Sequence, residues 1–344
     1  MPPVSAPPRR FALGDLPLAG GGVLSAATLD YRVYGTLAED RSNLVLYPSS
    51  YGAWPEDIDW VVGPILDPER WCVVLVSQFG NGRSSSPSTG DPGRAGGRWP
   101  VLDHRDNVAA QRRLLEEEFA VSSPALIYGW SMGAQQAYHW AVLEPERTQR
   151  ICCVCGTART TPHNRVFLLS LRQALTADRS WDGVRFQDLP EQGLRTFALI
   201  YASWAASQPF YRRGAHHQLG YASVEAYVEE AWLPAYRRHD PHDLLAMLDV
   251  WLANDVAAAA GFASGEADAD LAAALGRIRA RTAVIAGRHD LYFTPDDCGA
   301  EAALISTAQF EVLESDLGHR AGNPRDAPAE QRQLRAAVDR LCAI

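Results

Sequence analysis

Short apolar runs alternate with longer amphipathic stretches over much of the chain. Four runs are too short for helices and lack polar alternation, which is typical of parallel strands buried on both faces. They cover 44–47, 73–77, 125–129 and 151–156. Upstream, 9–18 and 23–34 predict a strand pair joined by three glycines. Stretch 103–119 predicts a helix capped by Asp103. This alternation favours an open α/β sheet with right-handed crossovers.

The alternation stops between 157 and 281 and then resumes. The later elements are expected as strand 282–287, helix 296–306, strand 309–314 and helix 329–341. The interrupted segment predicts helices rich in aromatic and arginine residues, over 164–176, 192–206, 223–238 and 243–260. Because strand–helix units resume after it, we expect an α/β core over 9–156 and 282–344, with 157–281 inserted as a helical lid. A second independent domain is the alternative, and residues 1–8 are expected to form a disordered tail.

The composition of the chain argues against several classes of function. The formal charge is −9, from 32 basic and 41 acidic residues without a basic run, which argues against a nucleic-acid or membrane-surface partner. All 32 basic residues are arginine, so no lysine can form a Schiff base or complete a P-loop. The six cysteines show neither disulfide nor zinc spacing and predict buried thiols in a reducing compartment. We find no signal-peptide pattern and no apolar run of the roughly 20 residues that span a bilayer, so we expect a cytoplasmic protein.

Ser131 gives the strongest chemical signal. It is the centre of Gly129-Trp130-Ser131-Met132-Gly133, a G-x-S-x-G pattern between a predicted strand and a predicted helix. In this setting a strained turn presents the serine oxygen at a helix N-terminus, and glycines two residues to either side prevent collisions. The context therefore predicts a nucleophile elbow, whereas the same pentapeptide in a loop would be an ordinary glycine turn.

A serine hydroxyl needs a base, and the base needs an orienting carboxylate. In sheets of this kind the acid and then the histidine follow the nucleophile along the chain, on loops after late strands. Asp290 follows strand 282–287, and His319 follows strand 309–314. We therefore predict Asp290 as the acid and His319 as the base. The alternatives for the acid are Asp297 and Asp316.

The other histidines are assigned to other places. His139 is expected to pack inside the helix after the serine, and His289 shares the loop of the acid. His104 and His163 are expected on the surface. The histidines expected to be solvated or structural in the lid are His216, His217, His239 and His242.

The oxyanion of a tetrahedral intermediate needs two hydrogen-bond donors. We predict the backbone N–H of Met132, the residue after the nucleophile, as the first donor. The second is expected from the loop after strand 44–47, where we favour the N–H of Ser50. Ser49 and Tyr51 of the same loop are the alternatives.

Assembled in this way, the chain resembles the α/β-hydrolase superfamily, and within it the homoserine O-acetyltransferase branch. Stretch 129–137, GWSMGAQQA, looks like the branch's GGSMGGMQA, and 290–295, DLYFTP, looks like its D-x-L-F-x-P acid loop. Phrases within 224–255 are similar to its lid helices. The resemblance implies an acyl-serine intermediate and a deep tunnel partly lined by lid residues.

Three departures from the branch bear on the substrate. Its histidine is usually followed by an aspartate that helps to hold the homoserine amine, whereas Arg320 follows His319 here and would repel an ammonium. Trp130 stands beside the nucleophile in place of glycine. The oxyanion loop 47–52 reads YPSSYG, where the branch has HALTG. A neutral or anionic substrate is therefore favoured over homoserine.

We expect a cofactor-free, metal-free serine enzyme that forms an acyl-enzyme and hydrolyses a small ester, thioester or lactone. The alternative is O-acyl transfer from acyl-CoA, as a co-substrate, to an acceptor other than homoserine. A non-catalytic binding protein and a cofactor-free lyase or isomerase are the rivals on the same fold. The expected partner is a small molecule, and a homodimer is left open. The residues expected to contact substrate are Tyr51, Trp130, Trp204, Arg212 and Arg320.

Overall fold

The computed structural model describes residues 6–90 and 99–343 of the 344-residue chain. Its centre is an eight-stranded sheet with the order β1-β2-β4-β3-β5-β6-β7-β8. β2 pairs antiparallel with β1 and with β4, whereas the remaining neighbours are parallel. The strands are β1 (Arg9–Pro17), β2 (Val23–Tyr34), β3 (Leu44–Pro48), β4 (Cys72–Val76), β5 (Leu126–Trp130), β6 (Arg150–Val154), β7 (Arg281–Gly287) and β8 (Ala308–Leu313). The mostly parallel α/β sheet predicted from the sequence is confirmed.

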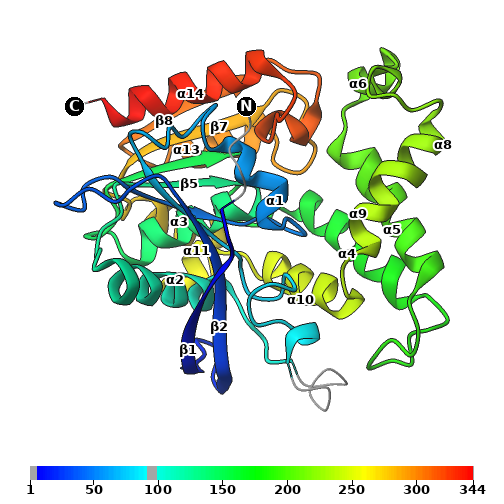
Figure 1. Ribbon diagram of the computed structural model, residues 1–344, viewed down its shortest axis with the longest axis horizontal. Coiled ribbons are helices and arrows are strands. Elements are labelled where there is room, and N and C mark those ends of the chain that lie inside the picture. The colour runs from blue at the N-terminus through cyan, green and yellow to red at the C-terminus, as the bar shows by residue number, and fades with distance from the viewer. Residues whose placement is uncertain (1–5, 91–98, 344) are drawn as a thin grey trace.

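Helices cover both faces of this sheet, which is why the central strands are apolar nearly throughout. Figure 1 shows α14 on one side of the sheet and α2, α3 and α11 on the other. The helices of the core are α1 (Pro55–Ile58), α2 (His104–Phe119), α3 (Met132–Leu143), α13 (Pro295–Ala302) and α14 (Pro328–Cys342), with short turns η1 (Asp59–Val61), η2 (Pro87–Thr89) and η4 (Gly318–Gly322). One hydrophobic cluster, which includes Trp140, fills the α3 side, and a second, which includes Leu334, fills the α14 side.

The start of α2 follows the predicted capping pattern. The side chain of Asp103 accepts a hydrogen bond from the N–H of Arg105 at 2.8 Å. In return, the carboxylate of Asp106 accepts one from the N–H of Asp103 at 3.0 Å. These contacts satisfy N–H groups that the first turn of a helix leaves unpaired, so the helix begins where the sequence predicts.

Between β6 and β7 the elements of the chain are helical. They are α4 (Pro162–Thr176), α5 (Glu191–Ala205), α6 (Gln208–Arg212), α7 (Ala215–Gln218), α8 (Val224–Tyr227), η3 (Val228–Trp232), α9 (Leu233–Arg237), α10 (Pro241–Leu252), α11 (Val256–Ala259) and α12 (Ala267–Leu275). Two expected helices differ in detail. The helix over 223–238 contains a π-helical turn at η3. The helix over 243–260 is divided, because the side chain of Asp255 caps α11 as a new start.

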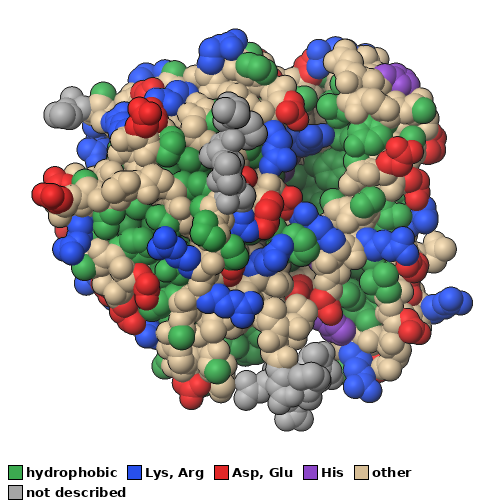
Figure 2. Space-filling model, in the orientation of Figure 1, with side chains coloured by type: hydrophobic (Ala, Val, Ile, Leu, Met, Phe, Trp, Pro, Cys, Tyr) green, Lys and Arg blue, Asp and Glu red, His purple; other side chains and the backbone are tan. Residues whose placement is uncertain are grey.

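The expected lid segment 157–281 has two parts in the structure. Helices α4 to α9, the outer helical layer, stand beside the sheet in Figure 1, whereas α11 packs against α3. Leu271 and Leu275 of α12 are buried in the cluster on the α3 side of the sheet. The last part of the segment is therefore a covering of the sheet. Figure 2 shows a hollow between the sheet layer and the outer helical layer, with hydrophobic side chains inside it.

A buried carboxyl joins the start of this segment to the core. Glu301 of α13 accepts hydrogen bonds from the N–H groups of Ala158 at 2.6 Å and Arg159 at 3.1 Å. Burial raises the pKa of Glu301 to about 8. The chain is thus fixed to α13 just after it leaves β6.

One expectation about a surface residue is corrected. His104 is buried, with 1% of its surface exposed, and its Nε2 lies 3.2 Å from Oε1 of Gln135. The polar neighbours of His104 in the sequence hid this burial. Of the tail expected over 1–8, residues 1–5 lie outside the described residues, and Ala6 packs against the hydrophobic cluster on the α14 side.

The burial of the cysteines agrees with the expectation from composition. All six cysteines are buried and free of disulfides. Within residues 6–90 and 99–343, no helix combines the length and the apolar character that crossing a bilayer requires. On the face shown in Figure 2, acidic and basic side chains are interspersed.

Candidate active site

Ser131 lies between β5 and α3 in a strained backbone conformation. Its φ is +56° and its ψ is −124°, a region that side chains other than glycine rarely adopt. The N–H of Ser131 donates to the carbonyl of Val154 at 2.9 Å, which fixes the turn to the end of β6. A Cβ on Gly129 would lie 2.2 Å from the carbonyl oxygen of Gly133, so the turn requires glycine at 129. This geometry is that of the strand–turn–helix elbow that the sequence predicts.

Gly133 is needed for a different reason. A Cβ at this position would lie 2.5 Å from the carbonyl oxygen of Pro48, the last residue of β3. The close approach brings the loop after β3 against the start of α3. Ser49 of this loop accepts a hydrogen bond on its hydroxyl from the N–H of Gln78 at 2.9 Å, and its carbonyl accepts one from Gln136 at 3.0 Å. The loop with the predicted oxyanion donor is thus held beside the elbow.

The two residues predicted to hold the oxyanion are both buried near this junction. Met132 is fully buried as the first residue of α3, and Ser50 is 1% exposed. The hydroxyl of Ser50 donates a short hydrogen bond to the carbonyl oxygen of Trp130. The loop after β3 is therefore bonded to the residue that precedes Ser131.

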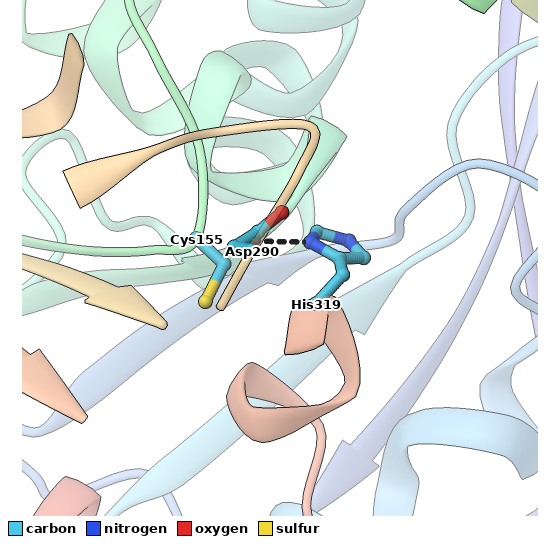
Figure 3. A group of neighbouring side chains, drawn as sticks. All are labelled: Cys155, Asp290 and His319. Atoms are coloured by element: carbon cyan, nitrogen blue, oxygen red, sulfur yellow. Dashed lines mark hydrogen bonds and ion pairs between the residues drawn. The ribbon is translucent and has the colours of Figure 1, made fainter. Parts of the chain in front are cut away.

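Asp290 and His319 form a buried hydrogen-bonded pair. Nδ1 of His319 lies 2.7 Å from Oδ2 of Asp290, as drawn in Figure 3. The other oxygen of Asp290 accepts hydrogen bonds from the N–H groups of Tyr292 at 2.8 Å and Phe293 at 3.2 Å. The carboxylate is thus fixed by its own loop after β7, and it can orient the imidazole carried by η4 after β8.

Aromatic rings enclose the imidazole of His319. Trp130 stacks on it, with ring centroids 5.1 Å apart and an angle of 26° between the planes. Tyr292 meets it edge-on at 4.6 Å, and Phe293 lies at 5.6 Å. Because Trp130 adjoins Ser131 in the chain, the stack brings the candidate base to the same edge of the sheet as the candidate nucleophile.

Cys155, at the end of β6, is a third buried neighbour of this pair. One ligand-type atom of each of Cys155, Asp290 and His319 lies within 4.8 Å of the others. Burial raises the pKa of the Cys155 thiol well above its usual value, so the sulfur is neutral at ordinary pH. In Figure 3 the sulfur points away from the imidazole, whose Nδ1 is already bonded to Asp290. Sequence reasoning placed Cys155 in a strand and gave no signal of its position here.

The predicted substrate residues lie in three different surroundings. Tyr51 is buried, stacks on Tyr201 at 5.8 Å, and donates its hydroxyl to the carbonyl of Leu244 at 3.0 Å. Trp204 of α5 is half-buried and stacks on Tyr292 at 6.1 Å. These two side chains connect the site with the helices of the inserted segment.

The two predicted arginines lie further out. Arg320 is half-buried, and its Nη1 donates to the hydroxyl of Tyr227 at 2.7 Å. Arg212 is exposed and lines a recess of about 470 Å³ together with His289 and Asp290. The structure therefore places Arg320 in η4, bonded to the last residue of α8, and Arg212 on the surface in a recess that Asp290 also lines.

Known proteins resemble this chain over most of its length. A curated relative, the ethyl acetate hydrolase of Pseudomonas veronii, is 36% identical over 312 residues, which cover 89% of this chain and 87% of that protein. The solved structure of the acetyl esterase MekB superposes with a TM-score of 0.92 at 34% identity, covering 98% of this chain and 97% of that one. A homoserine O-acetyltransferase of Thermobifida fusca is 28% identical over 336 residues, covering 88% of this chain and 86% of that protein.

The resemblance drawn from the sequence is therefore confirmed, and the chain is an enzyme of the predicted class. The sequence model of the alpha/beta hydrolase fold matches residues 47–321, which begin in β3 and end in η4. This span includes both the elbow and the Asp290–His319 pair. By this match and by its relatives, the chain belongs to the alpha/beta hydrolase fold family.

Proposed function

We propose that the chain is a serine esterase that hydrolyses acetyl esters of small alcohols. The observation that carries the proposal is the meeting of a strained serine elbow with a buried carboxylate–imidazole pair at one edge of the sheet. The choice of substrate is supported by similarity to proteins named ethyl acetate hydrolase and acetyl esterase.

The proposed reaction has two halves. His319 takes the proton of Ser131 while the serine oxygen attacks the ester carbonyl, and the N–H groups of Met132 and Ser50 bind the oxyanion. The tetrahedral intermediate collapses, the C–O bond to the alcohol breaks, and His319 returns the proton to the departing alcohol. Water then attacks the acetyl-serine by the same route and releases acetate and free Ser131. Asp290 holds Nδ1 throughout and stabilises the imidazolium.

Hydrolysis of p-nitrophenyl acetate tests this proposal. We expect turnover that Ser131→Ala abolishes, an acetyl adduct on Ser131 in quenched mass spectrometry, and a rate about tenfold higher for acetate than for octanoate esters. Ser123→Ala is a matched control, because Ser123 is half-buried in the loop before β5, where its hydroxyl donates to the carbonyl of Arg147. A wild-type protein that neither turns over these esters nor reacts with a fluorophosphonate would contradict the proposal and favour the binding-protein reading.

Transfer to an alcohol is the second candidate, and similarity to homoserine O-acetyltransferases favours it. Both reactions share the acyl-enzyme and differ in whether water or an acceptor reaches it. Acyl-CoA would then be a co-substrate. If acetyl-CoA is consumed only when an alcohol is added, and p-nitrophenyl acetate is not hydrolysed without one, transfer is the correct reaction.

We further propose a cytoplasmic enzyme that forms a homodimer. The free buried thiols support a reducing compartment. The exposed apolar residues Val166 and Leu169 of α4 and Leu199 of α5 support self-association through these two helices, which pack together. Light scattering should give twice the chain mass for the wild type and a monomer for Leu169→Glu/Leu199→Glu. A monomeric wild type at assay concentration would refute the dimer.

A further inference from the structure

Trp130 contacts two parts of the proposed site through different atoms. Its carbonyl oxygen accepts the hydrogen bond of the Ser50 hydroxyl, and its peptide continues directly into Ser131. Its indole stacks on the imidazole of His319, with 5.1 Å between centroids. One residue is therefore in contact with the oxyanion loop and the base while it adjoins the nucleophile.

The imidazole needs such a contact because its hydrogen bond fixes only one atom. Asp290 binds Nδ1 at 2.7 Å, which still allows the ring to tilt about that bond. The indole covers one face of the ring at an angle of 26°, and Tyr292 meets the ring edge-on at 4.6 Å. Together these contacts restrict the tilt, so Nε2 keeps one direction relative to the elbow.

The indole is also wedged against the short helix that carries the base. A Cβ on Gly322 would lie 2.6 Å from Cδ1 and 2.8 Å from Nε1 of Trp130. His319 and Gly322 both belong to η4, so the indole meets this helix at two points. Nε1 of Trp130 is buried without a hydrogen-bond partner among the described residues. Packing rather than a polar bond therefore holds the ring.

We propose that Trp130 is a positioning residue for His319, and that its stack keeps the imidazole aligned for proton transfer to and from Ser131. This inference rests on the proposed function, because it takes His319 as the base. The stack also places an aromatic face against the ring that becomes cationic during the reaction, an attractive arrangement. A misplacement of the base of about 1 Å lowers the rate on the order of a hundredfold.

Two substitutions and one control test the proposal. Trp130→Phe keeps a flat ring, whereas Trp130→Leu keeps apolar bulk without an aromatic face. The control is Trp181→Leu. Trp181 lies in the loop between α4 and α5, where its half-buried indole packs on Phe186 with ring centroids 4.7 Å apart. We expect Trp130→Leu to lower kcat for p-nitrophenyl acetate about 10- to 100-fold with KM nearly unchanged. The phenylalanine variant should recover most of kcat, and the control should equal the wild type.

A second measurement does not depend on turnover. His319 is 5% exposed, so diethyl pyrocarbonate should modify it slowly in the wild type and several times faster in Trp130→Leu, as followed by mass spectrometry. An unchanged modification rate with unchanged kcat would overturn the proposal. A rise in KM alone would also overturn it and assign the indole to substrate binding.

The two proposals can fail separately. If the wild type hydrolyses no ester, the proposed function fails, while the modification rates still decide whether Trp130 holds the imidazole. If Trp130→Leu does not fold, Trp130→Met takes its place in both measurements, because it also lacks an aromatic face. Wild-type kcat and a wild-type modification rate in that variant would refute the proposal.

Discussion

Two regions of the molecule bury imidazole rings, with opposite chemistry around them. At the sheet edge, His319 is 5% exposed and bonded to the carboxylate of Asp290. Between α2 and α3, His104 and His139 are 1% and 2% exposed, with ring centroids 5.0 Å apart. Their partners are amides: Gln135 for His104, and Asn254 for His139 at 3.0 Å. Burial is similar in both regions, so it does not by itself make a histidine a base.

The difference lies in what can compensate a positive charge. Burial lowers the pKa of His104 to about 4 and that of His139 to about 3, so both rings are neutral at pH 7. An amide oxygen orients such a ring but supplies no counter-charge. A carboxylate stabilises the imidazolium that forms when a base accepts a proton. The α2–α3 pair therefore contributes packing, whereas the pair at the sheet edge has the counter-charge that the proposed proton transfer requires.

The largest effect is expected when His319 is given an amide partner like those of His104 and His139. Asp290→Asn keeps the size of the side chain and removes its charge. It also favours the imidazole tautomer that cannot accept the proton of Ser131. We expect kcat for p-nitrophenyl acetate to fall about 10³- to 10⁴-fold with little change in melting temperature. Steady-state kinetics and differential scanning calorimetry measure the two effects.

Asp297→Asn is the matched control for that experiment. Asp297 was an alternative acid from the sequence, but it lies in the first turn of α13 and accepts a hydrogen bond from the hydroxyl of Thr294 at 2.7 Å. This control should retain activity within about twofold, since surface changes at caps act on stability. Equal losses of kcat in both variants would mean that Asp290 is not the carboxylate that orients His319.

The reverse exchange gives a buried histidine of the α2–α3 pair a carboxylate partner, and it should change stability rather than kcat. Asn254→Asp presents His139 with a carboxylate in a place that is 3% exposed. It also removes the amide donor Nδ2, which donates to the carbonyl oxygen of Thr157 at 3.3 Å. We expect a loss of about 2–4 kcal/mol of unfolding free energy at pH 7, measured by urea denaturation, with unchanged kcat per folded molecule. Full stability in this variant would show that the partner's charge is irrelevant at the α2–α3 pair.

The α2–α3 pair should make the protein sensitive to acid. Folding lowers the pKa of His139 from the ordinary 6.5 to about 3. Between these two pH values the ring therefore binds a proton in the unfolded chain and not in the folded one. Stability contributed by the neutral ring is complete above pH 6.5 and declines as the pH falls toward 3. His139→Gln should reduce the stability difference between pH 7 and pH 4.5 by roughly 2–3 kcal/mol. Urea titrations at both pH values measure it.

His217→Gln serves as the comparison for acid sensitivity, because His217 is exposed. Its stability difference between the two pH values should match that of the wild type. If His139→Gln behaves in the same way, the buried pair is not the source of the acid sensitivity.

The smallest expected effect comes from crowding the sheet edge without changing its polar groups. Gly322→Ala would place a methyl group 2.6 Å from Cδ1 of Trp130 and 2.8 Å from Sγ of Cys155. We expect the indole to shift, with a loss of about 1–3 kcal/mol in stability and a roughly tenfold lower kcat. Gly20→Ala is the control, since the nearest atom to its added Cβ is the carbonyl oxygen of Val101 at 3.9 Å. A Gly322→Ala variant with normal kcat would mean that the stack tolerates displacement.

The sheet edge could be predicted because its constraints are local or follow from topology. The glycine at 129 is required by a turn of five residues, and a turn between a short apolar run and a helix can be recognised in the sequence. Parallel strands bring their carboxyl ends to one edge, so Asp290 and His319 could be expected near each other although 29 positions separate them. The roles of these residues in catalysis stay predictions until the variants are measured.

The remaining features depend on contacts between distant segments, which no local pattern specifies. His104 sits in a polar sequence and is buried because α3 packs against α2 and brings Gln135 and His139 to its ring. The division of the expected helix 243–260 came from a single cap at Asp255. The orientation of the Trp130 indole depends on Gly322, which is far along the chain. Tertiary packing therefore decided what propensity and spacing left open.

The inserted segment leaves the sheet after β6 and returns at β7, and these strands are direct neighbours. A stretch of more than a hundred residues therefore begins and ends on neighbouring strands. The entropic cost of closing such a connection grows slowly with its length, so a longer or shorter segment would change the free energy of folding little. The connection to the sheet therefore sets little limit on the size of the outer helical layer. What limits its exchange is packing, because Trp204 of this layer stacks on Tyr292 and Tyr227 accepts a hydrogen bond from Arg320. Any replacement layer must restore these contacts to the loops that carry Asp290 and His319.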